Sequence, residues 1–299
     1  MSERSLNDSV CSMLDYSTPP SGLVGFLDFA GMWLGAAFFL FLPFELWRRH
    51  RARELTRQSG LEMLANLSAV VPNILVAGLV TAFVVWLFNA ASALAPWHMP
   101  VNIWTALAAI ILVDAVYYID HRIGHRVRLM WAFSHSVHHS SPLFNQTTAV
   151  RISFVDGFIS PWYYTSVILI GFDPLLVAAA FGFNLAYQQW IHTETIGKLG
   201  WFDRWFNSPS NHRVHHGSQP QYLDKNYGGI FMIWDRLFGT YEPEQEKVIF
   251  GLTEPINSVN PWKVHFEEFA RLIRKFQALK SGRAKIRLLL TGPDVIVSD

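Results

Sequence analysis

The chain has 299 residues, of which 51% are hydrophobic and only 16% are charged, whereas soluble domains carry roughly 25% charged residues. This composition, with a formal net charge of +1, excludes a disordered chain and a nucleic-acid-binding protein that depends on bulk positive charge. The single cysteine, Cys11, excludes an intrachain disulfide and metal sites of the CxxC type.

Long stretches with few charges predict helices that span a membrane. From residue 61 to residue 119 only Glu62 and Asp114 are charged, and a span needs about 20 mainly apolar residues. We expect three spans and then a hairpin of two shorter apolar segments, at 23–47, 63–88, 103–119, 154–170 and 174–191. The hairpin turns at a Gly-Phe-Asp-Pro sequence and either crosses or re-enters the membrane. Residues 1–20 do not resemble a cleavable signal peptide, so the first span is expected to remain as an anchor.

The basic residues sort to one side of these spans. If the chain crosses the membrane alternately, 23 of the 24 Lys and Arg residues lie on one side and only Arg4 lies on the other. Several of the 23 follow the first span directly, in the sequence WRRHRARELTR. Because Lys and Arg accumulate in cytoplasmic loops, this side is expected to face the cytoplasm.

Nine of the twelve histidines fall between residues 120 and 217, at the predicted cytoplasmic ends of the spans. They form the groups HRIGH, HSVHH, WIHTE and HRVHH. Residues three and four apart share one face of a helix, with Cβ atoms roughly 5–6 Å apart, so HRIGH, HSVHH and HRVHH can each direct two imidazoles at one centre. The other three, His50, His98 and His265, lie outside these groups and are assigned no metal-binding role.

The number of imidazoles bears on the number of metal ions. A zinc ion takes three or four protein ligands, so nine imidazoles suit two ions with four or five nitrogens each. Imidazole binds Zn, Cu, Fe and Ni, which leaves the element open at this point. Soluble di-iron bundles use Glu-x-x-His motifs, and no such motif occurs in the sequence. The pattern predicts a dinuclear, histidine-rich site of a different kind.

The order and spacing of these motifs resemble the membrane-bound fatty acid hydroxylase/sterol desaturase superfamily. The similarity runs from HRIGH through HSVHHSSPLFNQTTAVR, QQWIHTE and NSPSNHRVHHG to KNYGGIFMIWDRLFGTYEP. It covers residues 114–243. Within the superfamily, the WIHTE and HHSSP segments are most similar to the alkylglycerol monooxygenases and their bacterial relatives.

The resemblance implies a non-haem di-iron centre that activates O2. It assigns the ligand role to all nine grouped histidines, namely His121, His125, His135, His138, His139, His192, His212, His215 and His216. Carboxylates commonly orient metal-bound imidazoles from outside the ligand shell. Five acidic residues are candidates for that role, namely Asp120, Asp156, Glu194, Asp224 and Asp235.

The implied reaction is hydroxylation of a lipid (fatty acyl, sterol-like or ether lipid) at an unactivated C–H bond. Desaturation by the same di-iron centre is the alternative. A non-catalytic membrane carrier of metal or haem is a remote alternative, because a carrier is expected to place ionisable residues inside its spans.

The source of electrons is expected to lie outside the chain. The sequence holds no dinucleotide-binding motif and no haem-attachment motif. We expect a separate electron-transfer protein of the cytochrome b5 or ferredoxin/reductase type, with a tetrahydropterin as a further cofactor candidate by the same resemblance. The host membrane is expected to be a bacterial inner membrane rather than the endoplasmic reticulum.

The expected fold is all-α. It is an integral membrane helical bundle of about four to five spans or re-entrant segments, with a cytoplasmic helical cap that carries the histidines. We divide the chain into N-terminal anchor spans (1–110), a di-iron catalytic domain (111–245) and a cytoplasmic tail (246–299). Apolar and basic residues recur at helical spacing over 261–280. This pattern predicts an amphipathic helix that either lies on the membrane or packs on the cytoplasmic cap.

Overall fold

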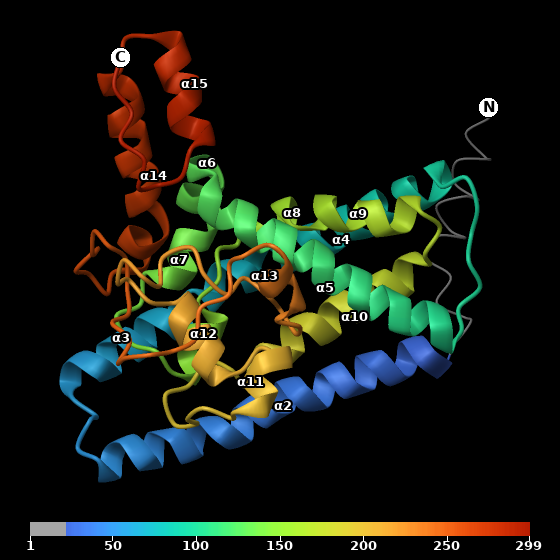
Figure 1. Cartoon of the computed structure of the whole chain (residues 1–299), viewed down its shortest axis with the longest axis horizontal. Helices are drawn as coiled ribbons and strands as arrows, with labels where there is room; N and C mark the ends of the chain where they lie inside the picture. Colours follow the sequence, from blue (N-terminus) through green and yellow to red (C-terminus); the bar gives the residue numbers. More distant parts are fainter. Residues whose placement is uncertain (1–21) are drawn as a thin grey trace.

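A computed structural model describes residues 22–299, and this part of the chain is almost entirely helical (Figure 1). Its only extended pairings are two isolated β-bridges, Phe206 with Phe231 and Gly217 with Phe250. The expected all-α fold is confirmed for these residues. The expectations for Cys11, for Arg4 and for the absence of a signal peptide concern residues outside the described part.

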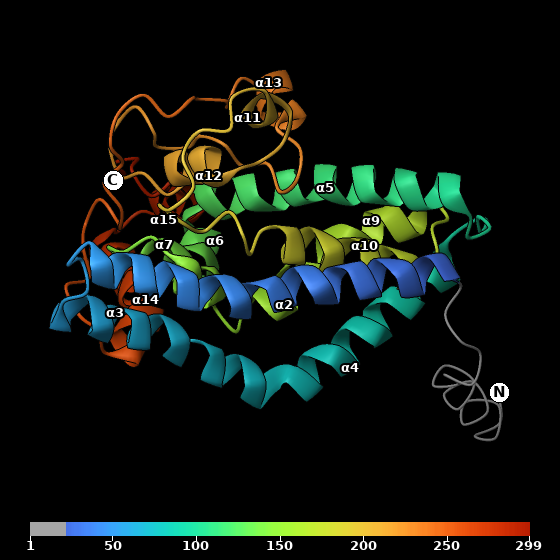
Figure 2. The same cartoon turned by 90° about the horizontal axis from the view of Figure 1, so that it is seen from below.

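Three long apolar units run along the molecule (Figure 2). They are α2 (Gly22–Arg51), α3 with α4 (Arg57–Ser68 and Val70–Leu94), and α5 (Ile103–Arg126). Each is long and apolar enough to cross a membrane. Large apolar side chains on them are exposed, such as Leu75 (78%) and Trp104 (76%), which water would disfavour. The chain is therefore a multi-pass membrane protein, and the three predicted spans are confirmed as helices.

The predicted hairpin consists of α8 (Asp156–Ile159), α9 (Pro161–Leu169) and α10 (Pro174–Tyr187). At 1.5 Å per residue, α9 and α10 are about 14 and 21 Å long, shorter than the roughly 30 Å of a bilayer core. The hairpin packs inside the bundle, where Val167 and Leu176 share a buried core with Val113 of α5. One side of the hairpin thus packs against the longer helices, while large apolar side chains such as Trp162 (53%) and Leu175 (54%) stay exposed on it.

The tip of the hairpin is fixed by a glycine. Gly171 has φ +101°, and a Cβ there would lie 2.6 Å from the Trp97 ring. The carbonyl of Gly171 accepts from the backbone N–H of Met99 (2.8 Å), and the carbonyl of Ile170 accepts from Nε1 of Trp97 (3.0 Å). These bonds join the tip to the loop between α4 and α5, at the end of the bundle away from the histidines.

Short helices gather at the other end of the bundle and form a cap (Figures 1 and 2). They are α6 (Arg128–Met130), the π-helical turn η1 (Trp131–His135), α7 (Ser136–His139), the 3-10 turn η2 (Gln146–Val150), α11 (Trp201–Trp205), α12 (Pro209–His215) and α13 (Ile233–Leu237). The cap helices carry five of the nine grouped histidines, and His216 directly follows α12. The C-terminal end of α5 supplies two more, and His192 follows α10.

The tail forms a helical hairpin of α14 (Pro261–Ala278) and α15 (Gly282–Leu290), which stands away from the body of the molecule in Figure 1. One face of α14 packs on the cap, where Phe269 contacts Phe133 with ring centroids 4.4 Å apart. Leu272 belongs to a small core with Ala132 and Leu288. The amphipathic helix thus packs on the cap, and its contact with a membrane stays a prediction.

We predict that Gly171→Ala destabilises the hairpin by about 1–3 kcal/mol, because the positive φ and the Trp97 ring both oppose a side chain there. Gly182 in α10 has ordinary helical backbone and no neighbour within 4 Å of a Cβ, so Gly182→Ala should be neutral or slightly stabilising. Thermal unfolding of both variants in detergent measures the difference. Equal melting temperatures would contradict this role for Gly171.

Candidate metal centre

Helix α5 presents the first pair of histidines. His121 and His125 lie one turn apart on the same face, with ring centroids 5.4 Å apart. Higher on this helix, the buried carboxylate of Asp114 accepts hydrogen bonds from the backbone N–H groups of Ile230 (2.6 Å) and Phe231 (3.1 Å). Asp114 therefore holds the segment around Ile230 and Phe231 against α5.

The second group lies on the turn from η1 to α7. His138 and His139 are adjacent in sequence, so their side chains leave the helix about 100° apart. His139 lies beside His215, with Nε2 atoms 3.0 Å apart, whereas His138 lies beside His192, with Nε2 atoms 3.2 Å apart. Two neighbouring residues thus serve two different centres.

The third group lies on α12, and the isolated histidine follows α10. Helix α12 begins with Ser208 as N-cap and Pro209 in its first turn, a sequence that favours a helix start. The rings of His212 and His215 lie nearly parallel, with centroids 5.2 Å apart. The ring of His192 is held at the end of α10 by a hydrogen bond from Nδ1 to the carbonyl of Gln188 (2.8 Å).

The nine histidines form two clusters, in each of which one ring nitrogen per residue lies within 4.8 Å of all the others. We call them the five-histidine cluster (His121, His125, His135, His139 and His215) and the four-histidine cluster (His138, His192, His212 and His216). All nine residues singled out in the sequence are thus brought together, and His50, His98 and His265 belong to neither cluster.

The imidazoles lie in a dry environment that favours their neutral form. His212 exposes 1% of its surface, and His215 and His216 each expose 3%. Burial, followed by repulsion between neighbouring rings, holds the pKa of these three side chains well below the usual 6.5. Burial also lowers the pKa of His138 to about 4. At neutral pH each ring therefore offers a lone pair.

The tautomer is fixed for four of these rings. Their Nδ1 atoms donate to backbone carbonyls at 2.8–3.2 Å, from His121 to Tyr227, His138 to Arg151, His192 to Gln188 and His215 to Lys225. A carbonyl oxygen only accepts, so Nδ1 carries the proton and Nε2 carries the lone pair. The Nε2 lone pairs of His138 and His192 therefore face each other at 3.2 Å, and they repel unless a cation lies between them.

This donor set fits a metal ion in each cluster. With metal–nitrogen bonds of about 2.1 Å, ligands at right angles lie about 3.0 Å apart. The closest Nε2 pairs lie 2.9 Å apart, between His121 and His135 and between His192 and His212. In addition, Nε2 of His125 is buried without a hydrogen-bond partner. A metal ion in each cluster would accept these converging lone pairs, and it would give the buried Nε2 of His125 a partner.

The five acidic candidates lie around the clusters, and within residues 22–299 none of them forms a hydrogen bond with a histidine ring. Asp235 accepts from the backbone of Tyr227 and Gly228 (2.8 and 2.7 Å), and Asp224 accepts from the hydroxyl of Tyr227 (2.9 Å). These two support the loop whose carbonyls orient His121 and His215. Backbone carbonyls therefore orient the histidine rings directly. The two carboxylates contact the loop that carries these carbonyls and not the rings themselves.

The other three candidates have different surroundings. Asp156 accepts from Ser134, Asp120 accepts from Ser160, and Glu194 pairs with Arg49 at 2.9 Å. Both aspartates line a cavity beside the histidines. Glu194 belongs instead to a polar network at the end of α2.

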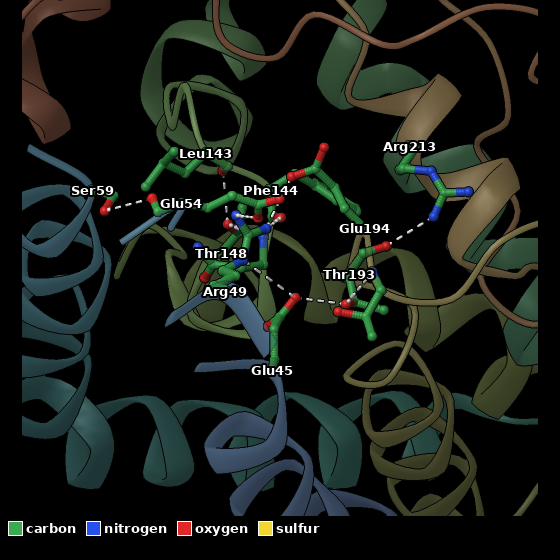
Figure 3. A network of polar contacts seen from close by, with 12 residues as sticks. Glu45, Arg49, Glu54, Ser59, Leu143, Phe144, Thr148, Thr193, Glu194 and Arg213 are labelled. Atoms are coloured by element: carbon green, nitrogen blue, oxygen red, sulfur yellow. Dashed lines mark hydrogen bonds and ion pairs between the residues drawn. The ribbon is translucent and has the colours of Figure 1, made fainter. Parts of the chain in front are cut away.

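In this network Glu45 and Arg49 of α2 lie beside Phe144, Thr193 and Glu194 (Figure 3). Glu45 is fully buried and accepts from the backbone of Gln146 (2.9 Å) and the hydroxyl of Thr193 (2.6 Å). Gln146 in turn donates to the carbonyl of His192 (3.2 Å). The sequence analysis missed Glu45, although an acidic residue inside a predicted span was a signal for a buried partner.

Two openings reach the clusters from different sides. The inner cavity, of about 360 Å³, lies between α4, α5 and α10 and touches His121 and His135 of one cluster and His138 and His192 of the other. The outer pocket, of about 80 Å³, touches only the five-histidine cluster. Its wall is made by Trp131, loops of the cap and the C-terminal tail.

Comparison with known proteins gives one family match and several relatives. Residues 106–240 match the family model described as fatty acid hydroxylase. The chain is 38% identical to an alkylglycerol monooxygenase of Xenopus tropicalis over 261 residues, covering 86% of this chain and 57% of that protein.

Two further relatives extend the comparison. The human alkylglycerol monooxygenase is 43% identical over 66% of this chain and 43% of its own length. Ornithine lipid hydroxylase OlsE of Rhizobium tropici is 28% identical over 52% of this chain and 47% of its own. The chain thus spans about half the length of the alkylglycerol monooxygenases that it matches. No solved structure matches it.

We expect Glu45→Gln to weaken metal binding at the four-histidine cluster roughly 10–100-fold, because outer groups that position ligands have effects of this size. The amide replaces one acceptor by a donor, which disturbs the backbone of Gln146 and thereby His192. Metal retained after dialysis against a graded chelator series measures the change. Glu54, an exposed neighbour of Arg49, gives the control Glu54→Gln, and equal retention by both variants would refute the role of Glu45.

Proposed function

We propose that the chain is a membrane-bound lipid monooxygenase whose nine histidines hold two iron ions. The observation that carries the proposal is the convergence of five and four neutral imidazoles on two adjacent centres. The match of residues 106–240 to the fatty acid hydroxylase model favours iron over the other metals that imidazole binds. When bound, the iron pair would activate O2 so that one oxygen atom enters a C–H bond.

The inner cavity is the proposed binding site for the lipid. Valines of α4 and two apolar side chains of α10 line it, namely Val80, Val84, Phe181 and Leu185. An alkyl chain that lies between α4 and α10 would bring its reacting carbon to the histidines. Because these helices belong to the membrane part, the lipid would enter sideways from the bilayer.

The lining of this cavity favours a lipid with an uncharged head group. The residues that line it include Asp120 and Asp156 and no Lys or Arg. A phosphate or carboxylate head group would find no cationic partner there. Tyr117 and Gln188, which are joined by a hydrogen bond of 2.8 Å, add uncharged polar groups to the wall. We propose a neutral single-chain lipid such as a glycerol ether, in keeping with the alkylglycerol monooxygenases among the relatives.

Hydroxylation is proposed rather than desaturation. The two relatives at about 40% identity are monooxygenases, whereas a Delta(7)-sterol 5(6)-desaturase of Gibberella zeae is 28% identical over 46% of this chain. Electrons would come from a cytochrome b5-like protein or a ferredoxin/reductase pair, with a tetrahydropterin as the alternative donor. The histidine end of the bundle is proposed to face the cytoplasm, in a bacterial inner membrane in preference to the endoplasmic reticulum.

The decisive experiment combines metal analysis with lipid analysis. The purified full chain should hold about two irons, as its nine imidazoles require. Cells that express it should accumulate neutral ether lipids that have gained one oxygen atom. A variant with His138→Ala and His215→Ala removes one ligand from each cluster and should lose both the iron and the product.

Other outcomes have distinct meanings. Lipids that lose two hydrogens without gaining oxygen would replace hydroxylation by desaturation. A protein that holds no metal and leaves every lipid class unchanged would refute the proposal.

A further inference from the structure

Helix α15 in the C-terminal tail has one buried face and one exposed face. Ala284 and Leu288 are buried in the small core that joins the tail to the cap. On the opposite side Ile286 and Leu290 expose 61% and 62% of their surfaces. Four exposed residues three or four positions apart share this side, namely Arg283, Ile286, Arg287 and Leu290. The exposed face thus combines two large apolar side chains with two guanidinium groups.

The charges of α15 differ from those of α14. On α14, Arg271 pairs with Glu267 and Glu268, so much of the charge on that helix is neutralised locally. Helix α15 contains two Arg residues and one Lys residue and no acidic residue. None of the three forms an ion pair within residues 22–299. The exposed face of α15 therefore keeps its positive charge and is complementary to a negatively charged surface.

Hydrogen bonds hold the end of α15 beside the end of a spanning helix. The carbonyl of Thr291, directly after α15, accepts from the backbone N–H of Arg128 (2.9 Å). The side chain of Arg128 donates to the carbonyl of Gly292 (2.7 Å). Helix α5 ends at Arg126, and its 24 residues extend about 36 Å, slightly more than the roughly 30 Å of a bilayer core. The end of α5 therefore lies near the membrane surface, and α15 lies at the same level.

The direction of the tail agrees with this level. In Figure 1 the long helices run from left to right, whereas the two tail helices run from top to bottom, with α15 nearer to the long helices than α14. The tail therefore extends along the membrane surface beside the bundle. Because Leu288 packs with Leu272 of α14, the opposite face of α15 points away from α14 and toward the bilayer.

We propose that α15 lies on the bilayer surface next to the spans and binds anionic lipids. Ile286 and Leu290 enter the boundary between head groups and acyl chains, and Arg283 and Arg287 contact lipid phosphates. Basic amphipathic helices bind membranes in this way, and the cytoplasmic leaflet, which the histidine end is proposed to face, carries anionic lipid. The contact does not depend on the proposed reaction, because it requires only that the long helices span the membrane.

A fluorophore on α15 tests this contact in the full chain. Cys11→Ser removes the natural thiol, and Ile286→Cys then carries a nitrobenzoxadiazole label in nanodiscs of phosphatidylcholine and phosphatidylglycerol. Gln277→Cys, at an exposed position of α14, carries the same label as the control site. A doxyl-labelled lipid should quench the label at position 286 at least about threefold more strongly than the label at position 277. Iodide in the water should quench the two labels in the opposite order.

The charge is tested with variants and with lipid composition. Arg283→Gln together with Arg287→Gln should lower lipid quenching at position 286 toward the value at position 277. Nanodiscs of phosphatidylcholine alone should have the same effect on the chain with both arginines, which excludes a folding defect as the cause. Arg274→Gln removes an exposed arginine of α14 and should leave the quenching unchanged.

Two results would overturn the proposal. The first is iodide quenching at position 286 as strong as at position 277 in nanodiscs with phosphatidylglycerol, which is the result expected if an acidic partner protein covers this face. The second is lipid quenching at position 286 that persists after loss of both arginines and of phosphatidylglycerol, since this would contradict binding to anionic lipid.

Discussion

The structure depends on holding neutral imidazole lone pairs close together in a dry site. Nε2 atoms 2.9–3.2 Å apart repel one another unless a cation lies between them. The surrounding chain counters this repulsion by fixing the rings from behind. Backbone carbonyls accept from Nδ1 of four histidines, which sets the tautomer and aims Nε2 inward. Because the carbonyls carry no net charge, they fix the rings without placing negative charge among these buried side chains.

Buried charged side chains do not contact the histidine rings in this way. Each of them instead forms hydrogen bonds that join segments distant in sequence. Asp114 holds the backbone after α12 against α5. Glu45 joins the end of α2 to the two loops beside the four-histidine cluster. Arg151 donates to the carbonyl of Val137 and the side chain of Asn66, which links α7 to α3, and its own carbonyl accepts from Nδ1 of His138. Two of these residues are carboxylates and one is a guanidinium, yet all three are buried and hydrogen-bonded. The spanning helices therefore support the clusters as well as anchoring the chain.

Sequence reasoning predicted the parts of this structure that follow from local patterns. Uncharged stretches gave the three long helices, and the spacing of the histidines selected the nine residues that meet. It also predicted four or five imidazoles for each ion, which matches the sizes of the two clusters. It could not assign His138 and His139 to different clusters, because that depends on how α7 lies against α12. Nor could it find the carbonyls that orient the rings, since every residue has one. The acidic candidates were chosen by residue type, and the fold places Asp120 and Asp156 beside a cavity.

The central claim is that two inequivalent metal ions are held by histidine nitrogens alone. The two openings agree with such inequivalence, because the inner cavity borders both clusters and the outer pocket borders only the five-histidine cluster. The most direct test is a Mössbauer spectrum of the full chain loaded anaerobically with isotopically enriched ferrous iron. The account predicts two quadrupole doublets of equal area, one from the five-histidine and one from the four-histidine cluster. A single doublet from one bound iron would contradict it.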